Sequence, residues 1–170
     1  MLAGVSRAYD RLVLAMAAVS AAIAAGLVVM ICLDVALRNI GWGNLPWAGE
    51  VSEYGLYLMT ILGAPWVLSR GGHVKMDIVA NHLRPASRRW LNLFVALLGL
   101  GVTLVLTWYG AAVTLASMAR GSLMLKTLVF PEWWLLAPLP VAMAIMAVGF
   151  LRDAGRVLAG QEPGFHGEGG

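Results

Sequence analysis

Four long apolar runs restrict this chain to one kind of architecture. They cover residues 12–36, 51–69, 90–118 and 133–151. About 20 apolar residues cross a hydrocarbon core about 30 Å thick, so each run is long enough to span a membrane. Backbone polar groups find no water in that core, and a helix satisfies them within the segment. The sequence therefore predicts an all-α integral membrane protein with four transmembrane helices.

The composition lies outside the range of soluble proteins, and the length leads us to expect no large soluble domain beside these runs. The chain is 60% hydrophobic and 12% charged, whereas soluble domains are about 45–50% apolar and about 25% charged. Its single cysteine, Cys32, rules out an intrachain disulfide. We expect one membrane domain over residues 1–159. A glycine-rich tail without apolar periodicity, at 160–170, is expected to be disordered.

The placement of basic residues predicts the orientation. The apolar run Leu12–Leu33 has 22 residues, longer than the 7–15 residues of a cleavable signal core, which favours a retained signal anchor. The net charge is +3, and the basic residues lie between the apolar runs. This placement is typical of membrane topology and not of nucleic-acid binding. Nine basic residues fall on one side and three on the other. The positive-inside rule then places both termini in the cytoplasm of a bacterium, with the chain in the inner membrane. The nine are Arg7, Arg11, Arg70, Lys75, Arg84, Arg88, Arg89, Arg152 and Arg156, and the three are Arg38, Arg120 and Lys126.

The cytoplasmic loop between the second and third runs has a pattern of its own. Val74, Ile78, Val79 and Leu83 recur at helical spacing, with charged residues mostly off that face. This pattern favours an amphipathic helix over about residues 74–84, lying on the inner membrane surface. A solvated basic loop is the alternative.

The middles of the four runs contain no ionisable residue. Asp34, Arg38, Glu50 and Glu53 lie near the periplasmic ends. They could form an ion relay, but salt bridging or solvation near the headgroups is the favoured interpretation, because functional charges usually lie deeper. The three histidines stand outside the runs, and no metal-ligand spacing occurs. We therefore expect no catalytic, cofactor or metal site.

Small residues and aromatics predict close helix contacts. Rows of small residues occur on the first run (Ala17, Ala21 and Ala25; Ala18, Ala22 and Gly26) and on the third (Gly99 and Gly101). Such rows allow close packing, within the chain or with a partner. Pro65 removes a helix hydrogen bond in the second run. Trp66 and Trp108 fit an interfacial aromatic belt less well than the other tryptophans, which suggests a helix–helix or subunit contact.

An ordered set of short motifs resembles a known family. The set is Arg38, then Pro46-Trp47-x-x-Glu50, then Leu62-Gly63-Ala64, then Arg70-Gly71-Gly72-His73-Val74-x-x-Asp77, and finally Pro131-x-Trp133 with Pro140. In this order it resembles the small membrane subunit (DctQ-type small permease) of tripartite ATP-independent periplasmic (TRAP) transporters. The chain departs from the family at two positions. Gly49 replaces the first of two adjacent carboxylates, and Glu53 stands where a basic residue is common.

The resemblance implies a non-catalytic scaffold. Family members pair with a large multi-span subunit that carries sodium and substrate, fed by a periplasmic binding protein that the small subunit helps to dock. The solute would be of the organic acid type, and sodium coupling is expected on the large subunit. Membrane lipids are further expected partners. The candidate interface or structural residues are Arg38, Trp47, Glu50, Glu53, Gly63, Pro65, Trp66, Arg70, His73 and Asp77.

Two other functions remain open at this point. A small proton-coupled exporter working as an oligomer would need Glu50 or Glu53 as an essential carboxylate at membrane depth. A membrane anchor for a redox enzyme lacks the axial histidines that haem requires.

Overall fold

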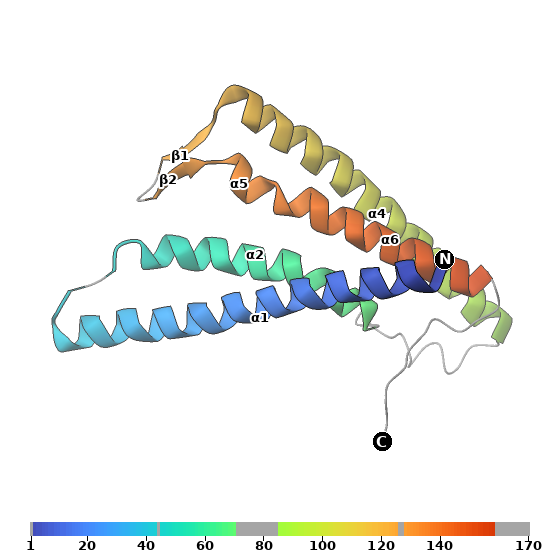
Figure 1. The fold of residues 1–170 in the computed structure, drawn as a ribbon, viewed down its shortest axis with the longest axis horizontal. Coiled ribbons are helices and arrows are strands. Elements are labelled where there is room, and N and C mark those ends of the chain that lie inside the picture. Colours follow the sequence, from blue (N-terminus) through green and yellow to red (C-terminus); the bar gives the residue numbers. More distant parts are fainter. Residues whose placement is uncertain (1, 44, 71–84, 126–127, 159–170) are drawn as a thin grey trace, which may run out of the picture.

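The computed structural model describes residues 2–43, 45–70, 85–125 and 128–158, which form five helices and two short strands (Figure 1). In chain order they are α1 (Leu2–Ile40), α2 (Ala48–Ser69), α4 (Pro85–Arg120), β1 (Leu123–Leu125), β2 (Val129–Pro131), α5 (Trp133–Leu136) and α6 (Pro138–Leu158). The predicted amphipathic helix at 74–84, the candidate residues His73 and Asp77, and the predicted disordered tail lie outside the described residues.

The first three predicted apolar runs each lie within one helix, and the fourth lies on α5 and α6, with a turn at Ala137 between them. Three helical stretches are long and apolar enough to cross a membrane: Ser6–Ile40, Trp90–Arg120 and Trp133–Leu158. The chain is thus a helical membrane protein. Helix α2 has 22 residues and carries two glutamates and Pro65, and it is not among the three. A fourth crossing through α2 stays a prediction.

The helices form a wedge of two pairs. Helix α1 packs against α2, and α4 packs against α6. The pairs meet where α2 contacts α6, beside the N-terminal half of α1, and they diverge toward the strands (Figure 1). We call the meeting place the closed end and the other the open end. Helices α1 and α4 have 39 and 36 residues, or about 58 and 54 Å. Both exceed the hydrocarbon core, so they must tilt or project.

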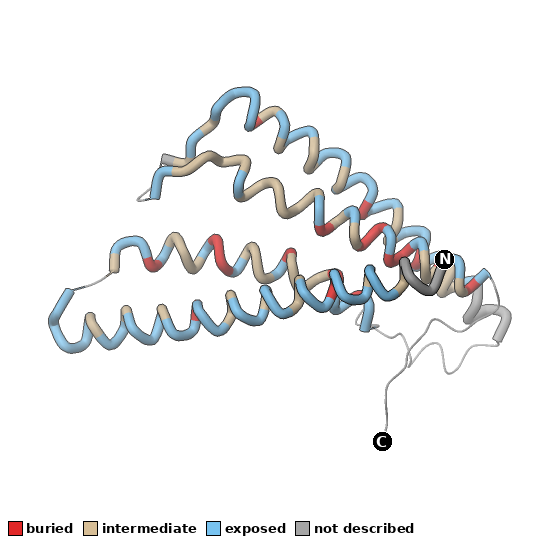
Figure 2. Tube along the Cα trace, viewed as in Figure 1, coloured by how far each residue is buried: buried red, intermediate tan, exposed pale blue. Residues whose placement is uncertain are grey.

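The core lies toward the closed end. Leu68 of α2 packs with Met146 and Phe150 of α6, and all three are buried. Buried stretches of α6 gather on this side in Figure 2. The Phe150 ring occupies the space beside Gly99 of α4, where any Cβ atom would collide with it. This confirms the prediction that Gly99 allows close helix packing. At Gly101, two residues on, nothing lies within 4 Å of a Cβ atom.

Small residues of α2 allow α1 to approach. A Cβ atom at Gly55 would lie 2.7 Å from a methyl carbon of Leu27, and one at Gly63 would lie 3.1 Å from Ser20 Oγ. The Ser20 hydroxyl also donates a hydrogen bond to the Met59 carbonyl oxygen, at 2.7 Å. The small residues predicted on α1 are mostly exposed, including Ala22 and Gly26. The small residues were predicted to pack either within the chain or against a partner. Because they are exposed here, contact with a partner stays a prediction.

A short β-hairpin is the one addition to the predicted all-α architecture within the described residues. Strands β1 and β2 pair antiparallel, with Met124 opposite Phe130. Gly121, with φ of 63°, turns the chain out of α4 and into this hairpin. Each strand has three residues, too few for the alternating pattern by which a strand is recognised from sequence.

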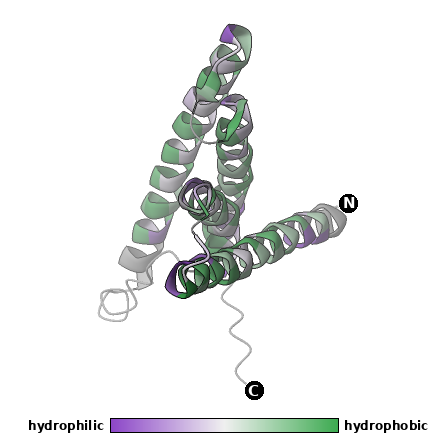
Figure 3. Ribbon diagram, turned by 90° about the vertical axis from the view of Figure 1, so that its left-hand side faces the viewer, coloured by the Kyte–Doolittle hydropathy of each residue, from purple (hydrophilic) through white to green (hydrophobic). Residues whose placement is uncertain are grey.

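The helix surfaces are apolar over most of their length. Figure 3 shows hydrophobic residues along each helix and polar residues mainly toward the ends. In the most apolar windows of α1 and α4 only 11% of residues are buried, against 28% in the window that spans α5 and α6. The two long helices therefore have few fully buried residues, and each carries many large apolar side chains that are exposed.

Candidate functional site

The predicted charges at the open end of α1 form an ion pair that also holds a loop. An Asp34 carboxylate oxygen lies 3.1 Å from an Arg38 guanidinium nitrogen. The other carboxylate oxygen accepts a hydrogen bond from the Leu45 backbone N–H, at 2.8 Å. The Asp34 side chain is only 14% exposed, whereas that of Arg38 is 68% exposed. Asp34 thus ties the end of α1 to the segment that leads into α2.

Glu50 contacts the hairpin of its own chain. Its Oε2 accepts a hydrogen bond from the Leu128 N–H at 3.0 Å. One turn further along α2, the Tyr54 ring meets the Phe130 ring edge-on, with centroids 5.4 Å apart. We call these two contacts the hairpin bridge. They join the α1–α2 pair to the α4–α6 pair at the open end.

The neighbours of Glu50 are more open. Trp47, the residue before α2, is 39% exposed, and its carbonyl accepts a hydrogen bond from the Val51 N–H at 3.0 Å. Glu53 is exposed. Their predicted role in a subunit interface stays a prediction.

The hairpin is also fixed to α4. Ser117, which is fully buried, donates a hydrogen bond to Glu132 Oε2 at 2.8 Å. The Glu132 N–H donates to the Ser122 carbonyl oxygen at 3.0 Å. This contact makes Glu132 a structural residue that the sequence analysis did not single out.

The remaining predicted residues lie along α2 toward the closed end. Gly63 faces Ser20, as described above, and Pro65 is fully buried inside the helix. Arg70 stacks over the Trp66 ring, with its guanidinium carbon 5.4 Å from the ring centroid. Arg70 follows the last residue of α2, where the negative end of the helix dipole stabilises a positive charge. The structure brings Trp66 and Arg70 together, and it places them away from Trp47 and Glu50.

A polar cluster around Arg152 at the closed end was not predicted. Arg152 pairs with Asp10 at 3.2 Å, donates a hydrogen bond to Ser6 Oγ at 2.7 Å and lies over the Tyr9 ring at 4.6 Å. The Tyr9 hydroxyl donates to the Ile145 carbonyl oxygen at 3.3 Å. This Arg152 cluster joins the start of α1 to α6. Asp10 and Arg152 are recognisable in the sequence as charges near helix ends. They are 142 positions apart, so no local pattern in the sequence predicts that they meet.

Two hollows on the described part of the chain differ in the residues that line them. A cavity of about 150 Å³ beside the Arg152 cluster is lined by Asp10, Arg152, Asp153 and Arg156 among others. Its charges pair with one another, because Arg156 also lies 3.6 Å from Asp153. It therefore offers no uncompensated charge for a substrate.

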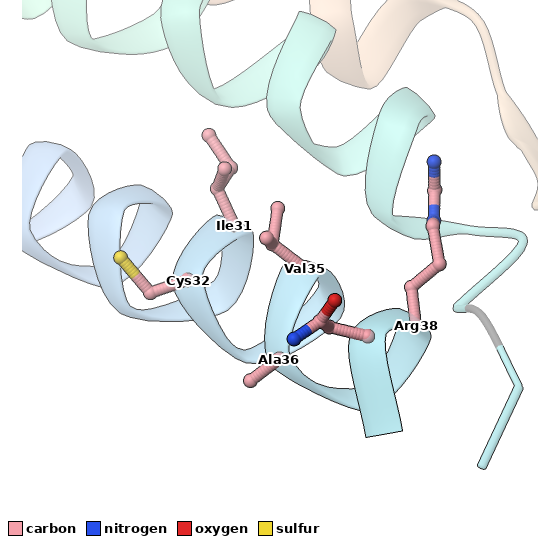
Figure 4. Close-up of a pocket in the computed structure, with 6 residues that line it drawn as sticks. Ile31, Cys32, Val35, Ala36 and Arg38 are labelled. Carbon is pink, nitrogen blue, oxygen red and sulfur yellow. The ribbon is translucent and has the colours of Figure 1, made fainter. Parts of the chain in front are cut away.

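The second hollow is a surface depression of about 560 Å³ on the outer half of α1. All the described residues that line it belong to that one helix: Ile31, Cys32, Val35, Ala36, Arg38 and Asn39. Figure 4 shows Cys32 and Ala36 pointing to one side and Ile31, Val35 and Arg38 to the other. Such a surface does not enclose a solute. Within the described ranges, no group of three or more histidine, cysteine or carboxylate side chains could hold a metal ion.

Comparison with known proteins identifies the family. The DctQ component of tripartite ATP-independent periplasmic transporters matches residues 27–160. The C4-dicarboxylate TRAP transporter small permease protein DctQ of Rhodobacter capsulatus is 32% identical over 127 residues, which are 72% of this chain and 52% of that protein. The match thus covers about half the length of the relative. The extent of the family match and the identity to this relative show that the chain belongs to the DctQ family of TRAP transporter small subunits.

Proposed function

We propose that this chain is the non-catalytic small permease subunit of a TRAP-type secondary transporter. In this role it scaffolds a large membrane subunit that carries sodium and substrate, and it helps to dock a periplasmic substrate-binding protein. The solute is an organic acid anion. The family assignment and the C4-dicarboxylate in the name of the Rhodobacter capsulatus relative support this solute class.

The observation that carries the proposal is the open apolar surface of α1 and α4. A carrier that worked alone would enclose a path lined by polar or ionisable groups at membrane depth. Here the two helix pairs diverge, and only 11% of the residues in the most apolar windows of α1 and α4 are buried. The carboxylates at the open end hold loops: Asp34 bonds Leu45, and Glu50 bonds Leu128. This arrangement fits a subunit whose surfaces are covered by a partner, with transport chemistry on that partner.

The charge distribution supports an orientation for the complex. Arg7, Arg11, Arg70, Arg152 and Arg156 all lie toward the closed end, and the positive-inside rule puts that end in the cytoplasm. With α2 as the fourth crossing, both termini are then cytoplasmic and the hairpin faces the periplasm of a bacterial inner membrane. The exposed Trp47 and the hairpin are the surfaces offered to the binding protein.

The test is co-purification. The tagged chain is produced with its genomic neighbours, extracted in mild detergent and analysed by mass spectrometry. Recovery of a large multi-span partner at fixed stoichiometry is expected. A chain that purifies alone, or only as an oligomer of itself, would contradict the proposal and favour the small exporter.

A further inference from the structure

Two aromatic side chains on α4, Trp108 and Tyr109, stand on the open surface of the wedge. Trp108 is 75% exposed and Tyr109 is 66% exposed. Neither the indole N–H nor the phenol O–H has a hydrogen-bond partner among the described residues. Each side chain ends in a hydrogen-bond donor, so its free energy in the membrane depends on whether an acceptor lies nearby.

The packing of α4 against α6 gives the depth of this pair. Gly99 lies beside Phe150, Gly110 lies beside Pro140, and Ser117 bonds Glu132. This antiparallel register places Trp108 level with about Val141. The apolar stretch between Glu132 and Arg152 contains 19 residues, about 28 Å long, and residue 141 is near its centre. Trp108 and Tyr109 therefore lie near the middle of the membrane.

Lipid is a poor neighbour for these side chains at this depth. Tryptophan and tyrosine favour the membrane interfaces, where the polar tip reaches water or headgroups. Acyl chains offer no acceptor, and an unpaired donor in hydrocarbon costs free energy. The three threonine hydroxyls of α4 avoid that cost within the helix, because Thr103, Thr107 and Thr114 each donate to the carbonyl four residues earlier.

The side chains around Trp108 differ in size in a way that suits packing against a second helix. Residues four and seven positions away share its face. They are Gly101, Leu104, Ala112 and Leu115, all exposed, and nothing lies within 4 Å of a Cβ atom at Gly101. A large side chain thus stands between two shallow positions, a shape into which a second helix can pack closely.

We infer that the α4 face centred on Trp108 and Tyr109 binds a transmembrane helix of the large subunit, which supplies hydrogen-bond acceptors at mid-membrane depth. This inference rests on the proposed function and adds the face and the chemistry of the contact. A second copy of this chain fits less well. A two-fold contact would bring two indole and two phenol donors together, and only the two Tyr109 oxygens could accept.

The first experiment is site-specific photo-crosslinking in the full complex. A photoreactive residue replaces Trp108, and a depth-matched one replaces Val141, which is 59% exposed on α6. Position 108 is expected to give an adduct with the large subunit, and position 141 to give much less. Adducts from position 108 only to lipid, or to a second copy of this chain, would overturn the inference.

The second experiment removes the donors. The double variant Trp108→Phe and Tyr109→Phe should retain about three- to ten-fold less large subunit in mild detergent, the range expected for one or two membrane hydrogen bonds. The thermal midpoint of the isolated chain should not change, since neither tip bonds within the described chain. The control is Thr107→Val, whose hydroxyl already bonds the Thr103 carbonyl, and retention should stay at the wild-type level.

These outcomes separate the inference from the proposed function. If the wild-type chain retains the large subunit and the double variant retains as much, the contact lies elsewhere and only the inference fails. If the wild-type chain retains no large subunit, the proposed function fails and the inference falls with it.

Discussion

The two ends of the wedge are held together in different ways. At the closed end, Leu68, Met146 and Phe150 pack directly against one another, and Arg152 bonds Ser6 and Asp10 of α1. At the open end, the helix pairs are apart, and the contacts that join them include the hydrogen bond and the ring contact of the hairpin bridge. The angle between the pairs is therefore set by packing at the closed end. The spacing of the open end depends on the hairpin.

This difference fits the proposed orientation. Direct packing of apolar side chains resists change, because each atom has many close neighbours. A solvent-exposed hydrogen bond such as that of Glu50 resists it less. A scaffold with a fixed cytoplasmic end and an adjustable periplasmic end would keep its hold on the large subunit while the hairpin meets the binding protein.

The largest effect is expected at Phe150. Changing Phe150→Ala removes the ring that fills the space beside Gly99, which should lower the free energy of unfolding by about 3 kcal/mol or more. Thermal or denaturant unfolding of the purified chain in detergent measures it. Val148→Ala, at a position that is 47% exposed on the same helix, should cost less than about 0.5 kcal/mol. Equal losses for the two variants would show that the closed end is not the core.

Overpacking the same contact should have a smaller effect. In Gly99→Ala the new methyl group meets the Phe150 ring, and the expected cost is about 1–3 kcal/mol. Gly101→Ala is the control, since open space surrounds its Cβ position and alanine favours a helix by up to about 1 kcal/mol. The order of stability should be Gly101→Ala, wild type, Gly99→Ala. The reverse order would refute the α4–α6 register.

At the open end, Glu50→Ala removes the acceptor for the Leu128 N–H. A hydrogen bond of this kind contributes about 1 kcal/mol, so amide exchange at Leu128 should become about five-fold faster, with little change in global stability. Gly49→Ala adds a methyl group in open space beside Glu50 and should leave the exchange rate unchanged. Unchanged exchange in Glu50→Ala would remove Glu50 from the hairpin bridge.

The smallest effect concerns the ion pair between Asp10 and Arg152. Asp10 is 59% exposed and Arg152 is 26% exposed, so solvent screens their attraction. A double-mutant cycle with Asp10→Asn and Arg152→Gln should give a coupling energy of about 0.2–1 kcal/mol that falls with added salt. A coupling above about 2 kcal/mol would mean that charge, and not packing, holds the closed end.

The helices could be predicted from sequence because length and apolarity alone specify them. The runs at 12–36, 90–118 and 133–151 each lie within a candidate span. Residue pairing could not be predicted. Small residues on α1 and on α4 look alike in sequence, yet Gly99 receives a ring while Gly101 faces open space. Which side of a helix meets its neighbour depends on the rotation of both.

The contacts of the candidate residues are of two kinds, those between neighbours in the sequence and those between distant residues. Salt bridging or solvation was the favoured interpretation for the charges near the periplasmic ends, and the ion pair that forms, Asp34 with Arg38, joins residues one turn apart. The bond from Glu50 to Leu128 joins residues 78 positions apart and depends on a hairpin too short to be recognised. Contacts of this kind carry no local signal. For that reason the sequence showed the charges and not their partners.

Solute uptake by proteoliposomes tests the central claim most directly. Vesicles holding this chain alone should take up no labelled C4-dicarboxylate. Vesicles holding the chain with its co-purified large subunit should take it up when the binding protein and a sodium gradient are supplied. Proton-driven transport by the chain alone, lost in Glu50→Gln or Glu53→Gln, would contradict the scaffold account.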